Sequence, residues 1–419
     1  MSHQSALLHS LTLPNGTVLP NRIAKAATQE NLADDDHQPG DRMLRLYSRW
    51  SAAGAGLIIT GNVMIDGTAM TGSADIVLDA LQPLEPFRAW AATARPSGGQ
   101  VWLQLSHPGR QVYSNLGQPT VAPSPVALKL GRLSPLFFST PKELSAQEIE
   151  RIVQSFARSA SMAEQAGFDG VELHAAHGYL ISQFLSPLTN LRNDRWGGSL
   201  EKRATFLIEI IKAIRLLVSP KFSLGVKLNS TDFQKGGFQV EDASAVVGFL
   251  NSLDVDLIEI SGGSYESPTG MNVNKADSTL RREAYYIDFA REISRTAKMP
   301  IMVTGGILDR STAELALEGG GSHAGVSMVG IATAMVFEPD LPRRWLAGFD
   351  ATVELPCSPS RPRIVSILVE AALAREQIRR LGRSERTRLA GPALLHATRD
   401  WRHGQKSNCN YRRWISSRT

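Results

Sequence analysis

The feature that most constrains this 419-residue chain is an eightfold alternation of short apolar segments with longer amphipathic ones. The short segments have the length and β-branched content of buried strands, and the longer ones carry apolar residues at helical spacing. The expected strands are residues 22–28, 56–62, 100–107, 170–177, 223–229, 257–262, 301–305 and 325–331. The expected helices are residues 41–53, 84–94, 146–166, 200–218, 241–253, 283–296, 311–318 and 341–346. Eight such units are what a closed parallel barrel requires, so we expect an α/β fold, a (β/α)8 TIM barrel.

Two segments lie outside the eight units. Near the N-terminus, the alternation of residues 11–19 around Asn15-Gly16 is typical of a β-hairpin, which we expect to cover the barrel floor. The barrel should occupy residues 1–350. Residues 351–419 should form a C-terminal extension that is helical over 363–381 and has little pattern from Gly391 onward. We expect this extension to be dispensable for the chemistry.

The extension is basic, with 14 Lys or Arg against 5 Asp or Glu, in a chain whose net charge is +5. A basic tail can mark contact with nucleic acid or a membrane. Its arginines are scattered among Leu, Ala and Glu without an aromatic-rich binding module, so we favour a solvated or partner-facing helix. We therefore expect neither nucleic acid nor a membrane as a partner, and a homo-oligomer is compatible with this surface.

Composition and cysteine content narrow the class of protein further. Hydrophobic residues make up 42% of the chain and charged residues 20%, which is ordinary for a soluble globular enzyme. No apolar run is long enough to span a bilayer, and residues 1–10 lack a secretory signal. The two cysteines, Cys357 and Cys409, are too few for a disulfide framework or a cluster held by four thiolates. We expect a cytoplasmic enzyme.

Glycine-bearing turns at the last two expected strands indicate a phosphate site. The active site of such a barrel forms at the carboxyl ends of its strands, where Gly305-Gly306 and Gly330 stand in the seventh and eighth units. Glycines there let backbone N–H groups approach a phosphate. No G-x-G-x-x-G segment follows an early strand, so FMN or a phosphorylated substrate is favoured over a dinucleotide on a Rossmann sheet.

The fourth expected strand ends in the group with the clearest chemistry. His174 and His177 lie where this strand gives way to a loop, and Tyr179 follows them. Two neighbouring imidazoles can donate hydrogen bonds to one carbonyl oxygen, and these bonds strengthen as that oxygen gains negative charge. A tyrosine is a weak acid that can give a proton to carbon at the end of such a reaction.

A metal site is the alternative interpretation of the same histidines. Together with His107 at the end of the third strand, His174 and His177 could bind zinc in a barrel hydrolase. No clear Asp or Glu ligand follows at a later strand end, and the fifth strand offers Lys227 instead. A lysine is a poor metal neighbour but a good partner for an anionic ring, so we predict no metal site.

The sequence resembles the old yellow enzyme family of FMN-dependent ene-reductases, also called NADH:flavin oxidoreductases. The resemblance runs from about Leu11 to Gly348 and is strongest in GFDGVELHAAHGYLISQFLSPLTN at residues 167–190. It continues through Arg192 and Asp194 into WGGSLEKR at residues 196–203. The supporting segments are NRIAKA at 21–26, GLIITG at 56–61, QLSHPGR at 104–110 and EPDLP at 338–342.

This resemblance implies an FMN site within residues 1–350. Gln104 would bond the pyrimidine edge of the flavin, Lys227 would stand near N1 and O2, and Asn62 would reach the ring from the second strand. The residues that would line the ring near its reactive edge are Ala26, Ala27 and Gln29, and those that would meet the phosphate are Gly305, Gly306 and Gly330.

The resemblance also implies the reaction. His174 and His177 would hold the carbonyl of an α,β-unsaturated substrate, and Tyr179 would protonate its α-carbon. NADH or NADPH would reduce the flavin and leave before the substrate binds, which is a ping-pong mechanism. The expected partner is thus a small molecule with an activated double bond, and the flavin supplies the hydride chemistry.

The chain departs from the family pattern at two places. Gln29 stands where the family usually has Thr or Cys beside the flavin, and Ala332-Thr333 stands where it usually has Gly-Arg. Because that arginine normally helps to hold the phosphate, a degenerate barrel with weak FMN binding and little activity is a further alternative.

Overall fold

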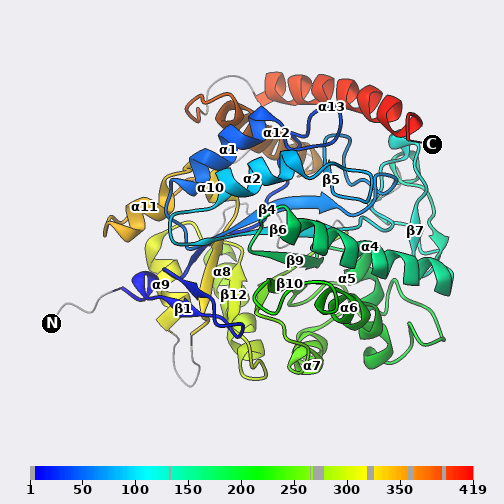
Figure 1. The fold of residues 1–419 in the computed structure, drawn as a ribbon, viewed down its shortest axis with the longest axis horizontal. Helices are drawn as coiled ribbons and strands as arrows, with labels where there is room; N and C mark the ends of the chain where they lie inside the picture. Colours follow the sequence, from blue (N-terminus) through cyan, green and yellow to red (C-terminus); the bar gives the residue numbers. More distant parts are fainter. Residues whose placement is uncertain are drawn as a thin grey trace.

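The computed structural model describes residues 5–131, 134–264, 266–267, 278–318, 325–356, 363–388 and 393–418. Within these residues, eight parallel strands form a closed ring, because β3 pairs with both β13 and β4 (Figure 1). The strands are β3 (Ile23–Lys25), β4 (Leu57–Met64), β6 (Gln100–Ser106), β9 (Gly170–Ala175), β10 (Ser223–Asn229), β11 (Leu257–Ser261), β12 (Ile301–Thr304) and β13 (Met328–Ile331). A short β5 (Ile76–Val77) adds to β4 outside the ring. The predicted TIM barrel is confirmed.

A helical layer surrounds the strands (Figure 1). Its helices are α1 (Asp41–Ser51), α2 (Glu85–Ala94), α4 (Ala146–Gln165), α6 (Leu200–Arg215), α7 (Val240–Leu250), α8 (Ser278–Ser294), α9 (Arg310–Glu318) and α11 (Leu341–Leu346). Each follows the strand predicted to precede it. α4 begins at a capping box. The Glu148 N–H donates to Ser145 Oγ, and the Ser145 N–H donates to the Glu148 carboxylate. The five-residue α10 (Thr333–Phe337) was not predicted, because a single turn has no periodicity.

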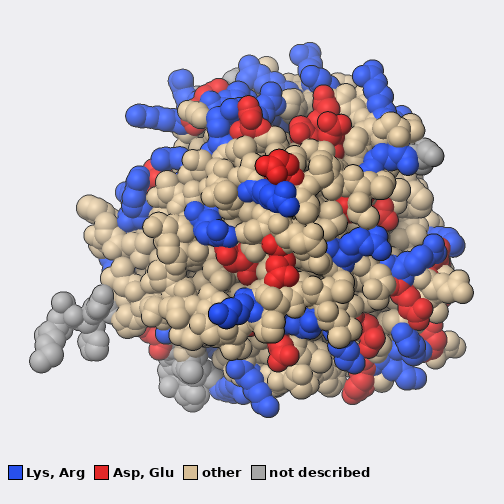
Figure 2. Space-filling view, in the orientation of Figure 1, with Lys and Arg blue, Asp and Glu red and all other residues tan. Residues whose placement is uncertain are grey.

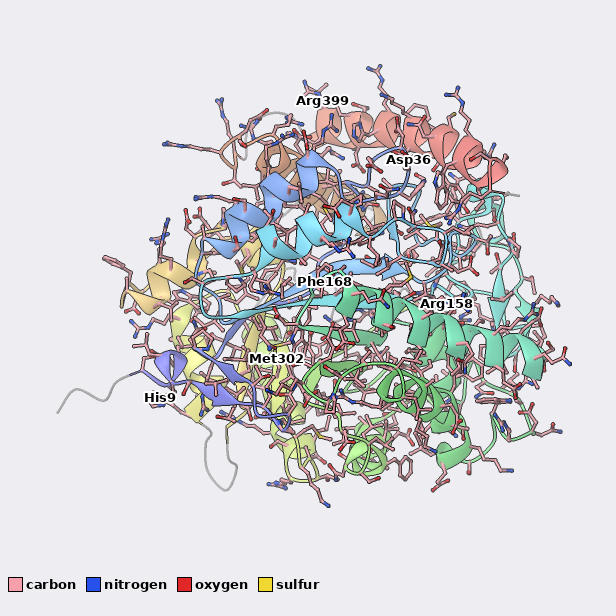
Figure 3. The ribbon with its side chains drawn as sticks, viewed as in Figure 1. His9, Asp36, Arg158, Phe168, Met302 and Arg399 are labelled. Atoms are coloured by element: carbon pink, nitrogen blue, oxygen red, sulfur yellow. The ribbon has the colours of Figure 1, made fainter. Side chains whose placement is uncertain are left out.

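The N-terminal segment covers the barrel floor as predicted. β1 (Leu11–Thr12) and β2 (Val18–Leu19) form an antiparallel hairpin, and Gly16 takes the left-handed conformation that its turn requires. Asn15 donates from Nδ2 to the Lys221 carbonyl at 3.1 Å and to Ser223 Oγ at 2.9 Å, at the amino end of β10. The hairpin leucines pack on barrel residues that include Trp102 and Met302, and Figure 3 labels Met302.

The long segment after β6 carries several short elements. They are η2 (Ser114–Leu116), β7 (Val121–Ala122), α3 (Ser134–Phe137) and β8 (Lys142–Glu143), and β7 pairs with β8 in parallel. A βα connection of this length lies at the catalytic face of the barrel. It is therefore placed to border the site.

The C-terminal extension consists of two helices that fold back on the barrel. α12 (Arg363–Gly382) contacts α1 and α10, and α13 (Ala393–Ser416) contacts α12 and η2. The expectation of little pattern beyond Gly391 is corrected by α13, which crosses the top of the molecule in Figure 1. Near the end of this helix, Tyr411 is fully buried, and Trp414 and Ile415 pack beside it. Tertiary packing, more than an amphipathic repeat, therefore stabilises this helix.

The basic character of the extension is visible on the surface. Lys and Arg side chains gather along the upper edge in Figure 2, over the helices of the extension, and Figure 3 labels the exposed Arg399 of α13 there. Among the described helices, none combines the length and the apolar character that crossing a membrane requires.

Candidate active site at the carboxyl ends of the strands

A cavity of about 370 Å³ lies at the carboxyl ends of the barrel strands. This volume falls within the roughly 300–1,000 Å³ typical of cofactor and small-molecule sites. The predicted residues that line it are Ala27, Gln29, His177, Lys227, Gly305, Gly306 and Gly330. The other predicted residues are buried without lining this cavity: Ala26, Asn62, Gln104, His174 and Tyr179.

Parallel register places the polar side chains on neighbouring strands. Lys227 of β10 stands opposite Glu259 of β11 on one side and opposite His174 of β9 on the other. Gln104 of β6 stands opposite Glu172 of β9, two residues before His174. The strands therefore assemble one buried polar layer beneath the cavity from residues far apart in sequence.

The charges in this layer compensate each other. Lys227 Nζ lies 2.5 Å from Glu259 Oε1, and Gln104 Nε2 donates to Glu172 Oε2 at 2.6 Å. Burial raises the pKa of Glu172 well above its usual range, and the neighbouring Glu259 carboxylate adds to the effect. Burial also acts to raise the pKa of Glu259. The charge of Lys227 and the hydrogen bonds made by the Glu259 carboxylate outweigh this effect, so the pKa of Glu259 is lowered. The surroundings therefore favour the neutral form of Glu172 and the ionised form of Glu259 beside Lys227.

Sequence reasoning missed Glu172 and Glu259. Each is a single charged residue inside an otherwise apolar strand, in the segments VELH and IEIS. A carboxyl group at such a position is expensive to bury unless it is paired, so an isolated charge in a buried strand is itself a signal of a polar partner.

The two histidines of the strand end are neutral. Burial lowers the pKa of His177 to about 3, and burial, with a contribution from the neighbouring His177 and Lys227, lowers that of His174 well below its usual value. The Ala176 N–H donates to His174 Nδ1 at 3.3 Å, which leaves the ring proton of His174 on Nε2. His177 Nε2 lies 2.9 Å from Ser261 Oγ. Both rings can thus donate a hydrogen bond without carrying charge.

The loop after β9 holds the rings in place. His177 has a left-handed backbone, its N–H donates to Asn229 Oδ1 at 3.1 Å, and Gln111 Nε2 donates to its carbonyl at 3.1 Å. The ring of His174 lies 5.1 Å from that of His177 and 4.7 Å from that of Tyr179, with both pairs near perpendicular. Tyr179 precedes the short α5 (Leu180–Leu185) and is 6% exposed. The three predicted groups therefore form one cluster.

Glycines after β12 leave space for a ligand. Gly305 and Gly306 both have positive φ, at 129° and 72°. A Cβ added to Gly305 would meet only the Tyr286 ring, at an ordinary van der Waals distance of 3.8 Å, so no side chain crowds the turn. Gly330 is different, because a Cβ there would lie 2.0 Å from Thr304 Oγ1. Packing against Thr304 thus already requires a glycine at position 330.

Gln29 is fixed by a neighbouring carboxyl group. Its Nε2 donates to Asp75 Oδ1 at 2.6 Å, and the Gly72 N–H donates to the other oxygen at 2.6 Å. Burial raises the pKa of Asp75 to about 7, against the lowering effect of these two bonds. The residue that departs from the family pattern is thus held rigidly at the cavity wall.

His107 does not join the other two histidines in a metal site among the described residues, where no three His, Cys, Asp or Glu side chains gather suitably. The Gly109 N–H donates to His107 Nδ1 at 3.1 Å, and burial lowers the pKa of this histidine to about 4. Its environment is that of a neutral, buried ring.

The C-terminal extension contributes to the cavity, which the strand pattern did not predict. One face of α12 lines it through Glu370, Ala371, Ala374, Arg375 and Ile378. These positions follow helical spacing, so a single helix closes one side of the site. Thr333 and Ala332 line the same cavity from the end of β13.

The residues present suit FMN. The glycine turn that lines the cavity would offer backbone N–H groups to a phosphate, and Lys227 would bring a positive charge to a ring that becomes electron-rich on reduction. Gln29, whose Nε2 is held by Asp75, lines the same cavity and would border the ring there.

Known proteins match the chain over most of its length. The profile of the NADH:flavin oxidoreductase / NADH oxidase family covers residues 7–350. An NADH-dependent flavin oxidoreductase, iliE, of Hypocrea jecorina is 38% identical over 353 residues, which cover 80% of this chain and 87% of that protein. The protein of the same name from a Neonectria species is 37% identical, and there the chain spans about half of the relative, 46%. The solved structure of morphinone reductase with tetrahydroNAD superposes with a TM-score of 0.69 at 26% identity, over 84% of this chain and 93% of that one.

Proposed function

Because this chain belongs to the NADH:flavin oxidoreductase / NADH oxidase family, the old yellow enzyme family, we propose that it reduces the activated C=C bond of α,β-unsaturated carbonyl compounds. The family assignment makes it a flavin-dependent oxidoreductase that uses FMN and NAD(P)H, and it disfavours a barrel hydrolase. The proposal adds the substrate class and a ping-pong order in which NAD(P)H departs before the substrate binds. FMN, when bound, supplies the hydride chemistry.

The observation that carries the proposal is the neutral pair His174 and His177 beside Tyr179. Their pKa values are depressed by burial, so each ring keeps a donor and no charge at neutral pH. We assign both rings to the carbonyl oxygen of the substrate. Neutral donors stabilise negative charge that develops on that oxygen without binding anionic ground states strongly, which favours a reaction through an enolate-like state.

Tyr179 is the proposed proton donor to the α-carbon. Its phenol stacks edge-on against His174 with ring centroids 4.7 Å apart, on the same loop as His177. This arrangement supports a division of labour in which the histidines hold the oxygen and the tyrosine protonates the carbon next to it.

The remaining predicted residues are proposed to hold the cofactor. Lys227 would stabilise the reduced ring with the charge that Glu259 now balances. The residues that would border the ring are Ala26, Ala27, Gln29, Asn62 and Gln104, and those that would meet the phosphate are Gly305, Gly306 and Gly330.

An anaerobic titration tests the proposal. We expect the purified, FMN-loaded protein to be yellow, to bleach with NADH or NADPH, and to regain its flavin absorbance when a cyclic enone such as 2-cyclohexenone is added. Production of the saturated ketone would be measured in the same samples. A reduced protein that is reoxidised by oxygen but not by enones would contradict the proposed substrate class while leaving the family activity intact.

A further inference from the structure

The cavity combines an open glycine turn with an uncharged neighbour at position 333. Thr333 lines the cavity next to the turn, and its hydroxyl brings no charge. A phosphate monoester carries between one and two negative charges near neutral pH, and the strongest protein partners for such a group are charge-assisted hydrogen bonds from arginine. A site for the FMN phosphate at Gly305-Gly306 therefore needs a cation from elsewhere.

Two candidate cations on neighbouring elements already form ion pairs with carboxylates. Lys227 lines the cavity from β10, but its ammonium pairs with Glu259 at 2.5 Å. Arg310 follows the turn in sequence, but its Nε lies 3.0 Å from Glu314, and it does not line the cavity.

Arg375 of α12 is the remaining arginine or lysine among the described residues that line the cavity. Small residues on the same helix face, Ala371 and Ala374, also line the cavity. α12 also contacts α10, the helix that begins at Thr333, so the helix that carries the arginine packs on the element that carries the uncharged position, and both residues line one cavity.

The guanidinium is oriented by the last helix. Arg375 Nε lies 3.0 Å from Asp400 Oδ1, and Nη2 lies 2.7 Å from Asp400 Oδ2. Asp400 of α13 also accepts from Arg379 at 2.9 Å, so this one carboxylate is shared between two arginines. The Nη1 group of Arg375 makes none of the hydrogen bonds found among the described residues, and it is available to a ligand.

We propose that Arg375, supplied by the C-terminal extension and oriented by Asp400, binds the phosphate of FMN in place of a cation at position 333. The inference rests on the proposed placement of that phosphate at the Gly305-Gly306 turn. Glu370 lines the cavity one turn earlier on α12 and already has an interaction partner. The extension is then part of the cofactor site, and not only a cover for the barrel.

The test compares FMN with riboflavin, which has the same ring and no phosphate. Apoprotein would be titrated with each flavin, and binding followed by quenching of flavin fluorescence. Replacing Arg375→Ala should raise the Kd for FMN about 10- to 100-fold, as expected for losing a hydrogen bond to a charged group, and leave the Kd for riboflavin unchanged. Arg380→Ala is the matched control, because Arg380 is on the same helix, pairs with Glu385 and does not line the cavity.

A compensating variant separates a direct contact from a structural effect. Thr333→Arg in the Arg375→Ala background should restore most of the FMN affinity and again leave riboflavin unaffected. If Arg375→Ala alone does not fold, Arg375→Ala with Asp400→Asn removes both partners of the ion pair, and the same selective loss of FMN affinity is expected.

Three results would overturn the inference. Unchanged FMN affinity in a folded Arg375 variant would do so, and so would an equal loss of FMN and riboflavin. A parent protein that binds riboflavin and FMN equally would show that no phosphate contact contributes. By contrast, a parent that binds neither flavin would overturn the proposed function itself, and this inference with it.

Discussion

The strand ends of the barrel and the C-terminal extension border one cavity, but they differ in how deeply their charged side chains are buried. In the barrel, Lys227 and Glu259 are almost fully buried and pair with each other, and burial shifts the pKa values of Glu172 and the two histidines in the direction that favours their neutral forms. In the extension, Arg375 and Asp400 form an ion pair that remains partly exposed, at 32% and 16% of their side chains. The buried groups can act on a reacting atom because their field is little screened, whereas the exposed ones can bind a charged ligand with a smaller desolvation cost. We therefore expect barrel changes to alter chemistry and extension changes to alter cofactor retention.

The largest effect should come from the proton donor. Tyr179→Phe keeps the ring that packs against His174 and removes the hydroxyl. Loss of a positioned general acid costs about 10²- to 10⁴-fold in rate, so the oxidative half-reaction with an enone should slow by that amount. Flavin reduction by NAD(P)H should be nearly unchanged in stopped-flow traces. Tyr113→Phe is the control, since Tyr113 is 41% exposed and does not line the cavity. Equal slowing of both half-reactions would remove Tyr179 from its proposed role.

The second largest effect should come from His174→Ala. Removing one donor to a developing oxyanion costs about 10²- to 10³-fold in rate, and binding of a phenolic inhibitor should weaken as well. His9→Ala is a suitable control, because His9 is exposed near the hairpin that covers the barrel floor and does not line the cavity. His9 is labelled in Figure 3. If the variant reduces enones at the parent rate, the carbonyl is held by other groups.

The contrast between the regions also explains what the sequence could predict. Lys227 and His174 were expected at one edge of the barrel because parallel strands end there together, and the strand register places them side by side. The hairpin was found because the signal of its turn is local. Arg375 was missed because its position depends on how α12 docks on α1 and α10, and no local pattern encodes that contact.

A pH-dependent stability is expected from the barrel side. The folded-state pKa of Asp75 is raised to about 7, above the roughly 3.9 of an unfolded chain. Between these values the native state binds the extra proton, so the free energy of unfolding should fall as pH rises from about 4 to 7, by at most about 1.4 kcal/mol per pH unit. Asp75→Asn should flatten this part of the profile in urea unfolding measured at several pH values. A parallel decline in the variant and the parent would show that Asp75 is not the titrating group.

The smallest effect should come from the contact that links the two regions. Asp400→Asn leaves the charge of Arg375 in place but removes the carboxylate that orients it, while the amide oxygen can still accept one of its hydrogen bonds. Because a neutral hydrogen bond contributes roughly 0.5–1.5 kcal/mol, we expect the Kd for FMN to rise about 2- to 10-fold, less than for loss of the arginine itself. The contrary result, a rise in FMN affinity, would show that the guanidinium released from Asp400 turns fully toward the phosphate. A titration of apoprotein with FMN distinguishes the two, and riboflavin serves as the reference because neither outcome should change its binding. A fall in affinity would mean that α13 positions the cofactor cation through Asp400, whereas a rise would mean that Asp400 competes with the phosphate for it.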